Sequence, residues 1–136
     1  MRTQAPAERT LTQIDYVRLT RLVSLSEPRS TGAIRELLEN SDLVASPAVP
    51  ATVITMYSQM LVQDVTDGEP CKVTLCYPDD AEPSEGFISV LSPMGASLLG
   101  LRVGDVAQWR TPRGNERMAL VVEVLFQPEA SGDFTT

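Results

Sequence analysis

The first third of the chain has apolar residues at helical spacing. Two stretches repeat at three- and four-residue intervals: Tyr16, Leu19, Leu22 and Val23, then Ile34, Leu37, Leu38 and Val44. This spacing predicts one helix over residues 15–25, capped by Asp15, and a second over residues 33–45. Pro28 and Gly32 in the intervening stretch exclude a single continuous helix. We therefore expect a short antiparallel helical hairpin, similar to a coiled coil, within residues 1–46.

The period of the pattern changes to two after a proline-containing linker at residues 47–52. The predicted strands are residues 53–56, 60–64, 71–77, 88–91, 106–110 and 118–126. Between two of them, Pro93 suits the first turn of a short helix and Gly100 suits its end. Ser92 is placed to cap that helix. Residues 53–136 are thus predicted to form an α+β domain with a curved antiparallel sheet and one short helix.

Composition narrows the possible functions. The chain has 136 residues, of which 43% are hydrophobic and 21% charged, as expected for one main globular domain. Its net charge of -7 disfavours a sequence-independent grip on nucleic acid, so we expect no direct, specific contact with nucleic acid. The N-terminus lacks an apolar signal region and no run approaches a membrane span, so we expect a cytoplasmic protein.

Residues that commonly carry chemistry are scarce. The chain has no histidine, which removes the commonest general base and metal ligand, and no phosphate-binding glycine loop. Cys71 and Cys76 lie on opposite faces of one predicted strand, roughly 16 Å apart, too far for a disulfide. We interpret them as isolated buried thiols. The acidic residues between Asp79 and Glu85 could suggest a cation site, but the surrounding prolines favour a solvated loop. We expect no cofactor and no bound metal.

A resemblance to a known family rests on an ordered series of residues in the second half of the chain. The series is Ile88–Pro93, Leu98–Gly100, Gly104–Asp105, Thr111–Pro112, Gly114 and Val121–Val124. It resembles the C-terminal domain of the Gre transcript-cleavage factors, which has an FKBP-like fold. The resemblance is closer to the Rnk branch of that family, named for regulation of nucleoside diphosphate kinase. That branch extends the match to Val53–Met56, Tyr77–Pro78 and Gly100–Asp105.

The resemblance implies that the protein binds RNA polymerase near the secondary channel. Family members dock through the loop bearing the Ser-Pro pair, so the candidate polymerase-binding residues are Leu91, Ser92, Pro93 and Met94. Gre factors often have a carboxylate or amide where this chain has Leu91, which favours an apolar contact. Ser92 also caps the short helix, and both roles are compatible.

The predicted hairpin is too short to act as a Gre-type arm. A dozen helical residues span roughly 18 Å, and the connection carries one acid, Glu27, where a shared metal ion needs two or more oxygen ligands. We therefore predict a monomeric, non-enzymatic regulator that does not stimulate transcript cleavage and competes with Gre factors for polymerase.

Three alternatives stay open. One is an active Gre-type cleavage factor, and another is direct control of a kinase. The third is a peptidyl-prolyl isomerase, which would need an aromatic-lined pocket. Its candidate lining is Trp109, Phe87, Tyr77, Tyr57 and Phe126, although aromatics make up only 5% of the chain.

Overall fold

The computed structural model describes residues 8–66 and 68–132. Residues 1–7 and 133–136, at the ends of the two predicted regions, lie outside the described residues. The helices are α1 (Gln13–Leu25), α2 (Gly32–Asn40) and α3 (Pro93–Leu98). The strands are β1 (Thr10–Thr12), β2 (Asp42–Val44), β3 (Gln59–Asp64), β4 (Pro70–Cys76), β5 (Phe87–Ser89), β6 (Val106–Arg110) and β7 (Glu116–Phe126). The predicted α+β class is confirmed.

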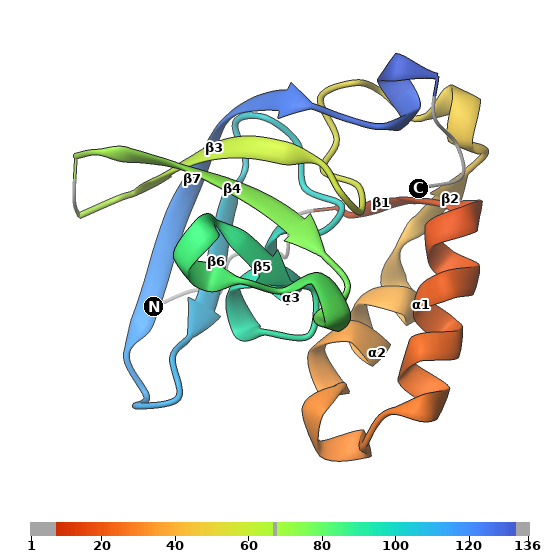
Figure 1. Ribbon diagram of the computed structural model, residues 1–136, viewed down its shortest axis with the longest axis horizontal. Coiled ribbons are helices and arrows are strands. Elements are labelled where there is room, and N and C mark those ends of the chain that lie inside the picture. The colour runs from red at the N-terminus through yellow and green to blue at the C-terminus, as the bar shows by residue number, and fades with distance from the viewer. Residues whose placement is uncertain (1–7, 67, 133–136) are drawn as a thin grey trace.

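Five strands form one curled sheet in the order β5-β4-β3-β7-β6 (Figure 1). Neighbouring strands run antiparallel, as predicted, except β4 and β5, which are parallel at one edge of the sheet. The long β7 pairs with β3 through two shifts in register, a type of irregularity that bends a sheet. Helix α3 contacts β5 and β6.

The first predicted helix begins two residues earlier than expected. Its N-cap is Thr12, whose Oγ1 accepts a hydrogen bond from the Asp15 backbone N–H at 3.0 Å. The prediction that Asp15 caps the helix is therefore wrong. Asp15 lies in the first turn and is almost fully buried, at 2% exposure.

The second predicted helix is shorter than its periodicity suggested. It ends at Asn40, because Ser41 has extended backbone angles and the Asp42 N–H donates to the carbonyl of Arg9 at 2.9 Å. Residues 42–44 then form β2, which pairs in parallel with β1. In a segment of only three residues, the spacing of apolar residues fits one turn of a helix and a short strand equally well.

The N-terminal elements pack against the sheet domain. Leu19 and Val23 of α1 and Ile34 and Leu37 of α2 belong to the same buried cluster as sheet residues such as Met60. Helices α1 and α2 contact each other and lie beside the sheet rather than projecting away from it (Figure 1).

The two thiols differ in environment. Cys76 is buried, as predicted, but Cys71 is exposed because the first three residues of β4 face solvent. Both are free thiols. Within the described part of the chain, no helix combines the length and apolarity needed to cross a membrane.

Candidate docking surface

The loop that precedes α3 is held in place by its own hydrogen bonds. Ser92 is the N-cap, as predicted: its Oγ accepts from the Gly95 N–H at 3.0 Å and donates to the Ser89 carbonyl at 2.7 Å. Pro93 occupies the first helical turn, where its fixed φ costs nothing. The loop therefore presents its outer side chains from a defined backbone.

Gly95 allows α3 to lie directly on the end of β5. A Cβ atom at this position would stand 1.9 Å from the Ser89 carbonyl oxygen, far inside van der Waals contact. Only glycine fits without moving the backbone. The contact fixes the first turn of α3, and thus Pro93 and Met94, against the sheet.

The loop Leu91–Met94, here called the ridge, separates two hollows. Ser92, Pro93 and Met94 line one of about 230 Å³, together with Pro83, Ile88, Trp109 and Pro112. Leu91 faces the other, which is larger, at about 660 Å³, and is bounded by α1. Pro93 and Trp109 also border a third hollow of about 730 Å³ beside α2. The structure therefore brings three of the four predicted residues to one hollow and directs Leu91 to a different one.

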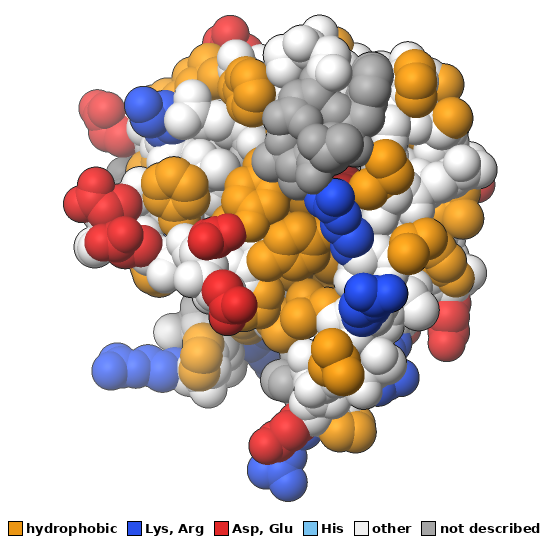
Figure 2. All heavy atoms as spheres, turned by 45° about the vertical axis from the view of Figure 1, so that its right-hand side comes forward, with side chains coloured by type: hydrophobic (Ala, Val, Ile, Leu, Met, Phe, Trp, Pro, Cys, Tyr) orange, Lys and Arg blue, Asp and Glu red, His pale blue; other side chains and the backbone are white. Residues whose placement is uncertain are grey.

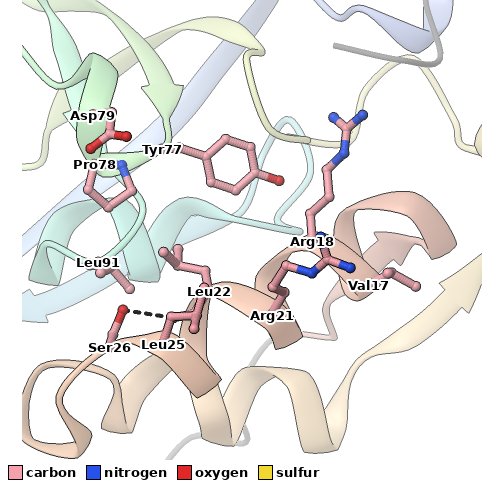
Figure 3. Close-up of a pocket in the computed structure, with 10 residues that line it drawn as sticks. All are labelled: Val17, Arg18, Arg21, Leu22, Leu25, Ser26, Tyr77, Pro78, Asp79 and Leu91. Atoms are coloured by element: carbon pink, nitrogen blue, oxygen red, sulfur yellow. Dashed lines mark hydrogen bonds between the residues drawn. The ribbon is translucent and has the colours of Figure 1, made fainter.

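The hollow of about 660 Å³ that α1 bounds, called the α1 groove, is built from two regions distant in sequence. One wall is α1 with Val17, Arg18, Arg21, Leu22, Leu25 and the adjacent Ser26; the other is Tyr77, Pro78, Asp79 and Leu91. Figure 3 shows both arginines projecting from α1 and the ring of Tyr77 pointing across toward Arg18. Sequence analysis did not assign α1 to any site. The available signal was two apolar residues, Val17 and Leu25, on the helix face opposite its buried positions.

Two tyrosines support the far wall of the α1 groove. The rings of Tyr57 and Tyr77 lie 5.7 Å apart at 55°. The Tyr57 hydroxyl donates to a carboxylate oxygen of Asp80, and burial together with this bond raises the Tyr57 pKa to about 12. Burial also raises the pKa of Tyr77, whose hydroxyl is enclosed. Both phenols stay protonated at neutral pH, so this wall is uncharged apart from its acids.

A buried polar junction holds α1 against the sheet domain. Asp15 Oδ2 accepts from the Met56 N–H at 3.1 Å. Nearby, the Thr55 and Ser58 hydroxyls lie 2.9 Å apart, and Thr55 Oγ1 donates to Glu129 Oε1 at 2.7 Å. Burial raises the Asp15 pKa to about 6, and the negative charge of Glu129 adds to this shift. The junction sets the position of α1 and therefore the width of the α1 groove.

The other candidate features are dispersed. Of the five aromatics considered for an isomerase pocket, Tyr77 and Trp109 line different hollows, and Phe87 and Phe126 are exposed. The acidic residues after Pro78 are largely exposed, as expected of a solvated loop. Within residues 8–66 and 68–132, no three His, Cys, Asp or Glu side chains are grouped to hold a metal ion.

Comparison with known proteins agrees with the resemblance noted in the sequence. Residues 49–126 match the family model described as "Transcription elongation factor, GreA/GreB, C-term". The chain therefore belongs to the GreA/GreB family. The regulator of nucleoside diphosphate kinase (Rnk) from Escherichia coli strain K12 is 36% identical over 117 residues, which cover 82% of this chain and 86% of that protein.

Two further similarities support the assignment. A transcription elongation factor GreA from Solidesulfovibrio magneticus is 44% identical over 72 residues, which cover 53% of this chain and 44% of that protein. The solved structure of a prokaryotic transcription elongation factor GreA/GreB from Nitrosomonas europaea has a TM-score of 0.74 at 30% identity. It covers 88% of this chain and 99% of the solved chain.

Proposed function

We propose that this protein is a cytoplasmic, non-enzymatic regulator that binds RNA polymerase through the ridge Leu91–Met94. The observation that carries the proposal is a rigid ridge beside an apolar hollow in a member of the GreA/GreB family. Ser92 and Gly95 fix the backbone, which leaves Pro93 and Met94 as preorganised contacts. Preorganised apolar contacts lose little entropy on binding.

The proposal includes a fold assignment finer than the α+β class. We infer that the sheet domain is FKBP-like and that α1 and α2 form a shortened helical hairpin, with residues 47–52 as the boundary. The tight connection through the 3₁₀ turn Pro28–Ser30 and the contact between the two helices support the hairpin.

The same proposal holds that the protein does not stimulate transcript cleavage. Helix α1 has 13 residues and α2 has 9, so the longer spans only about 20 Å. Their apolar faces are buried in the common core, which keeps the pair close to the sheet. The connection between them contains the single carboxylate Glu27. A factor of this shape would occupy a docking site without delivering acidic groups at a distance.

The direct test is co-purification with core RNA polymerase. We expect the double variant Pro93→Ala, Met94→Ala to lower affinity by at least about tenfold, since hot-spot truncations commonly cost 2 kcal/mol or more. Met118→Ala provides a control, because Met118 is an exposed methionine on β7 that lines none of the three hollows. Unchanged affinity of the double variant would refute the ridge as the docking element.

Competition is measured separately. Added to stalled elongation complexes, the protein should reduce Gre-stimulated cleavage and add none of its own. Cleavage above the level without any factor would instead support the active-factor alternative. Persistence of full Gre activity at saturating concentration would exclude competition.

A further inference from the structure

The solvent-exposed face of α1 carries two large apolar side chains. Val17 is 61% exposed and Leu25 is 80% exposed, the highest value among the exposed large hydrophobic residues of the described chain. These residues and Arg21 are spaced four apart, so they lie along one line of the helix. The line borders the α1 groove, where Leu22 and Leu91 add further apolar surface.

The α1 groove is also a basic site on an acidic protein. The chain carries a net charge of -7, yet Arg18 and Arg21 both line this groove, and Asp79 lies on the opposite wall. Figure 2 shows apolar side chains gathered at the centre of this face, with basic side chains on one side and acidic ones on the other. This arrangement favours a partner whose carboxylates lie toward α1.

We propose that the α1 groove binds an amphipathic helix of RNA polymerase, with its apolar side chains in the groove and carboxylates beside Arg18 and Arg21. The inference rests on the proposed function and adds a second anchoring point to the ridge. Leu91 belongs to both surfaces, so one partner can cover them together. The groove is lined mainly by apolar side chains of α1 and the facing loops, and a helix laid in an apolar groove is a recurrent mode of recognition.

The shape of the groove favours a helix over a strand. Its walls are a helix and two loops, at Tyr77–Asp79 and Leu91, and neither loop offers a strand edge for pairing. The polar junction at Asp15 holds α1 at a fixed distance from those loops. The groove is therefore present before binding.

Two variants separate the charged and apolar parts of the interaction. We expect Arg21→Glu to lower affinity for core RNA polymerase about tenfold at low salt, with a smaller effect at high salt because exposed charges are screened. We expect the double variant Val17→Ser, Leu25→Ser to lower affinity about tenfold at both salt concentrations. Serine and valine have similar helix propensities, and Leu25 is the last residue of α1, so the fold should be retained, as circular dichroism and thermal unfolding will verify.

Matched controls use the same substitutions elsewhere. Lys72→Glu makes the same charge reversal on exposed β4, and Val65→Ser removes a valine that is 53% exposed beyond β3. Both controls should bind within about twofold of the unmodified protein. Groove variants that bind as well as these controls would overturn the inference while leaving the ridge intact.

Two other outcomes would also decide against the groove. Failure of the unmodified protein to bind polymerase would refute the proposed function and the groove partner with it. If sedimentation shows a dimer that Val17→Ser, Leu25→Ser dissociates without any loss of polymerase binding, the groove is a contact between copies of this chain.

Discussion

Long-range hydrogen bonds hold the backbone at the polar junction under α1, whereas local contacts hold the backbone at the ridge before α3. At the junction, Asp15 accepts from the Met56 N–H, and Gln127, two residues before Glu129, donates to the carbonyls of Pro50 and Val53, so both side chains reach backbone groups distant in sequence. At the ridge, Ser92 and Gly95 make local contacts with Ser89 and Val90, and the side chain of Pro93 is exposed. The junction therefore ties together parts of the chain that are distant in sequence, whereas the ridge can change its outer residues without unfolding the domain.

The largest effect should come from the backbone contact beneath the ridge. Gly95→Ala should lower the free energy of unfolding by about 3 kcal/mol or more, because the new methyl group would overlap the Ser89 carbonyl. Gly32→Ala is the control: Gly32 begins α2 with open space around it, so the substitution should be neutral or slightly stabilising. Urea denaturation measures both. Equal stability of the two variants would show that the backbone at the ridge moves to accommodate the new methyl group.

The contribution of the junction residue Asp15 to the free energy of unfolding should depend on pH. The folded-state pKa of Asp15, about 6, lies above the ordinary 3.8, so the folded protein binds this proton more tightly than the unfolded chain. Stability from this group is complete below about pH 4 and is lost as the pH rises to 6. Asp15→Asn removes the titration while keeping an acceptor for Met56. The stability difference between the two proteins should change by about 3 kcal/mol between pH 3 and pH 7.

Denaturation of both proteins at each pH tests this. Asp64 titrates in the opposite direction: its hydrogen bonds with Thr66 and Arg117 lower its pKa to about 2, so its stabilisation is lost on acidification below pH 4. Because Asp64 is present in both proteins, its effect cancels in the difference. Parallel pH profiles would contradict the assignment of Asp15.

A smaller loss is expected at Gln127, which directly follows β7. The Gln127 side-chain amide donates to the carbonyls of Pro50 and Val53, at 2.8 and 2.7 Å, and is 3% exposed. Gln127→Leu should cost about 2 kcal/mol, because the buried carbonyl of Val53 loses its donor, whereas the carbonyl of Pro50 keeps the Val53 N–H. Gln108→Leu on the exposed side of β6 should cost much less. If thermal unfolding shows equal losses of stability for Gln127→Leu and Gln108→Leu, the hydrogen bonds of Gln127 contribute no more than an exposed amide does.

The smallest effect concerns the cap of α3. Ser92→Ala removes the acceptor for the Gly95 N–H and should cost about 1 kcal/mol. Polymerase affinity should fall less than in the Pro93→Ala, Met94→Ala variant, since the outer side chains are kept. Calorimetry and a binding titration on the same samples compare the two. A binding loss as large as that of the double variant would mean that the cap, rather than the apolar contacts, determines docking.

Much of the ridge was predictable because its chemistry is local. Ser92 before Pro93 is a capping pattern that the neighbouring residues Ser89 and Gly95 complete by themselves. The order of glycines and prolines around it also indicated the family, which residues 49–126 confirm. The four docking residues remain a prediction from that resemblance.

The junction and the groove were not predictable in the same way. Asp15 looked like a cap because the sequence shows a carboxylate at a helix start but not the Met56 N–H that it contacts, 41 residues away. Residues 42–44 fit the helical spacing of the residues before them, and the sequence does not show that they pair with β1 as a parallel strand. Tyr77 and Arg18 share a groove only because α1 folds onto the sheet.

The amino-acid sequence by itself determined the α+β class, the capped α3 and the family, since each depends on short-range pattern or on the order of turn residues. Only the tertiary structure decided where α1 lies, which carboxylate is buried, and that Leu91 faces a different hollow from its neighbours. The physical reason is that burial and long-range hydrogen bonds depend on which surfaces meet, and local periodicity leaves that choice open.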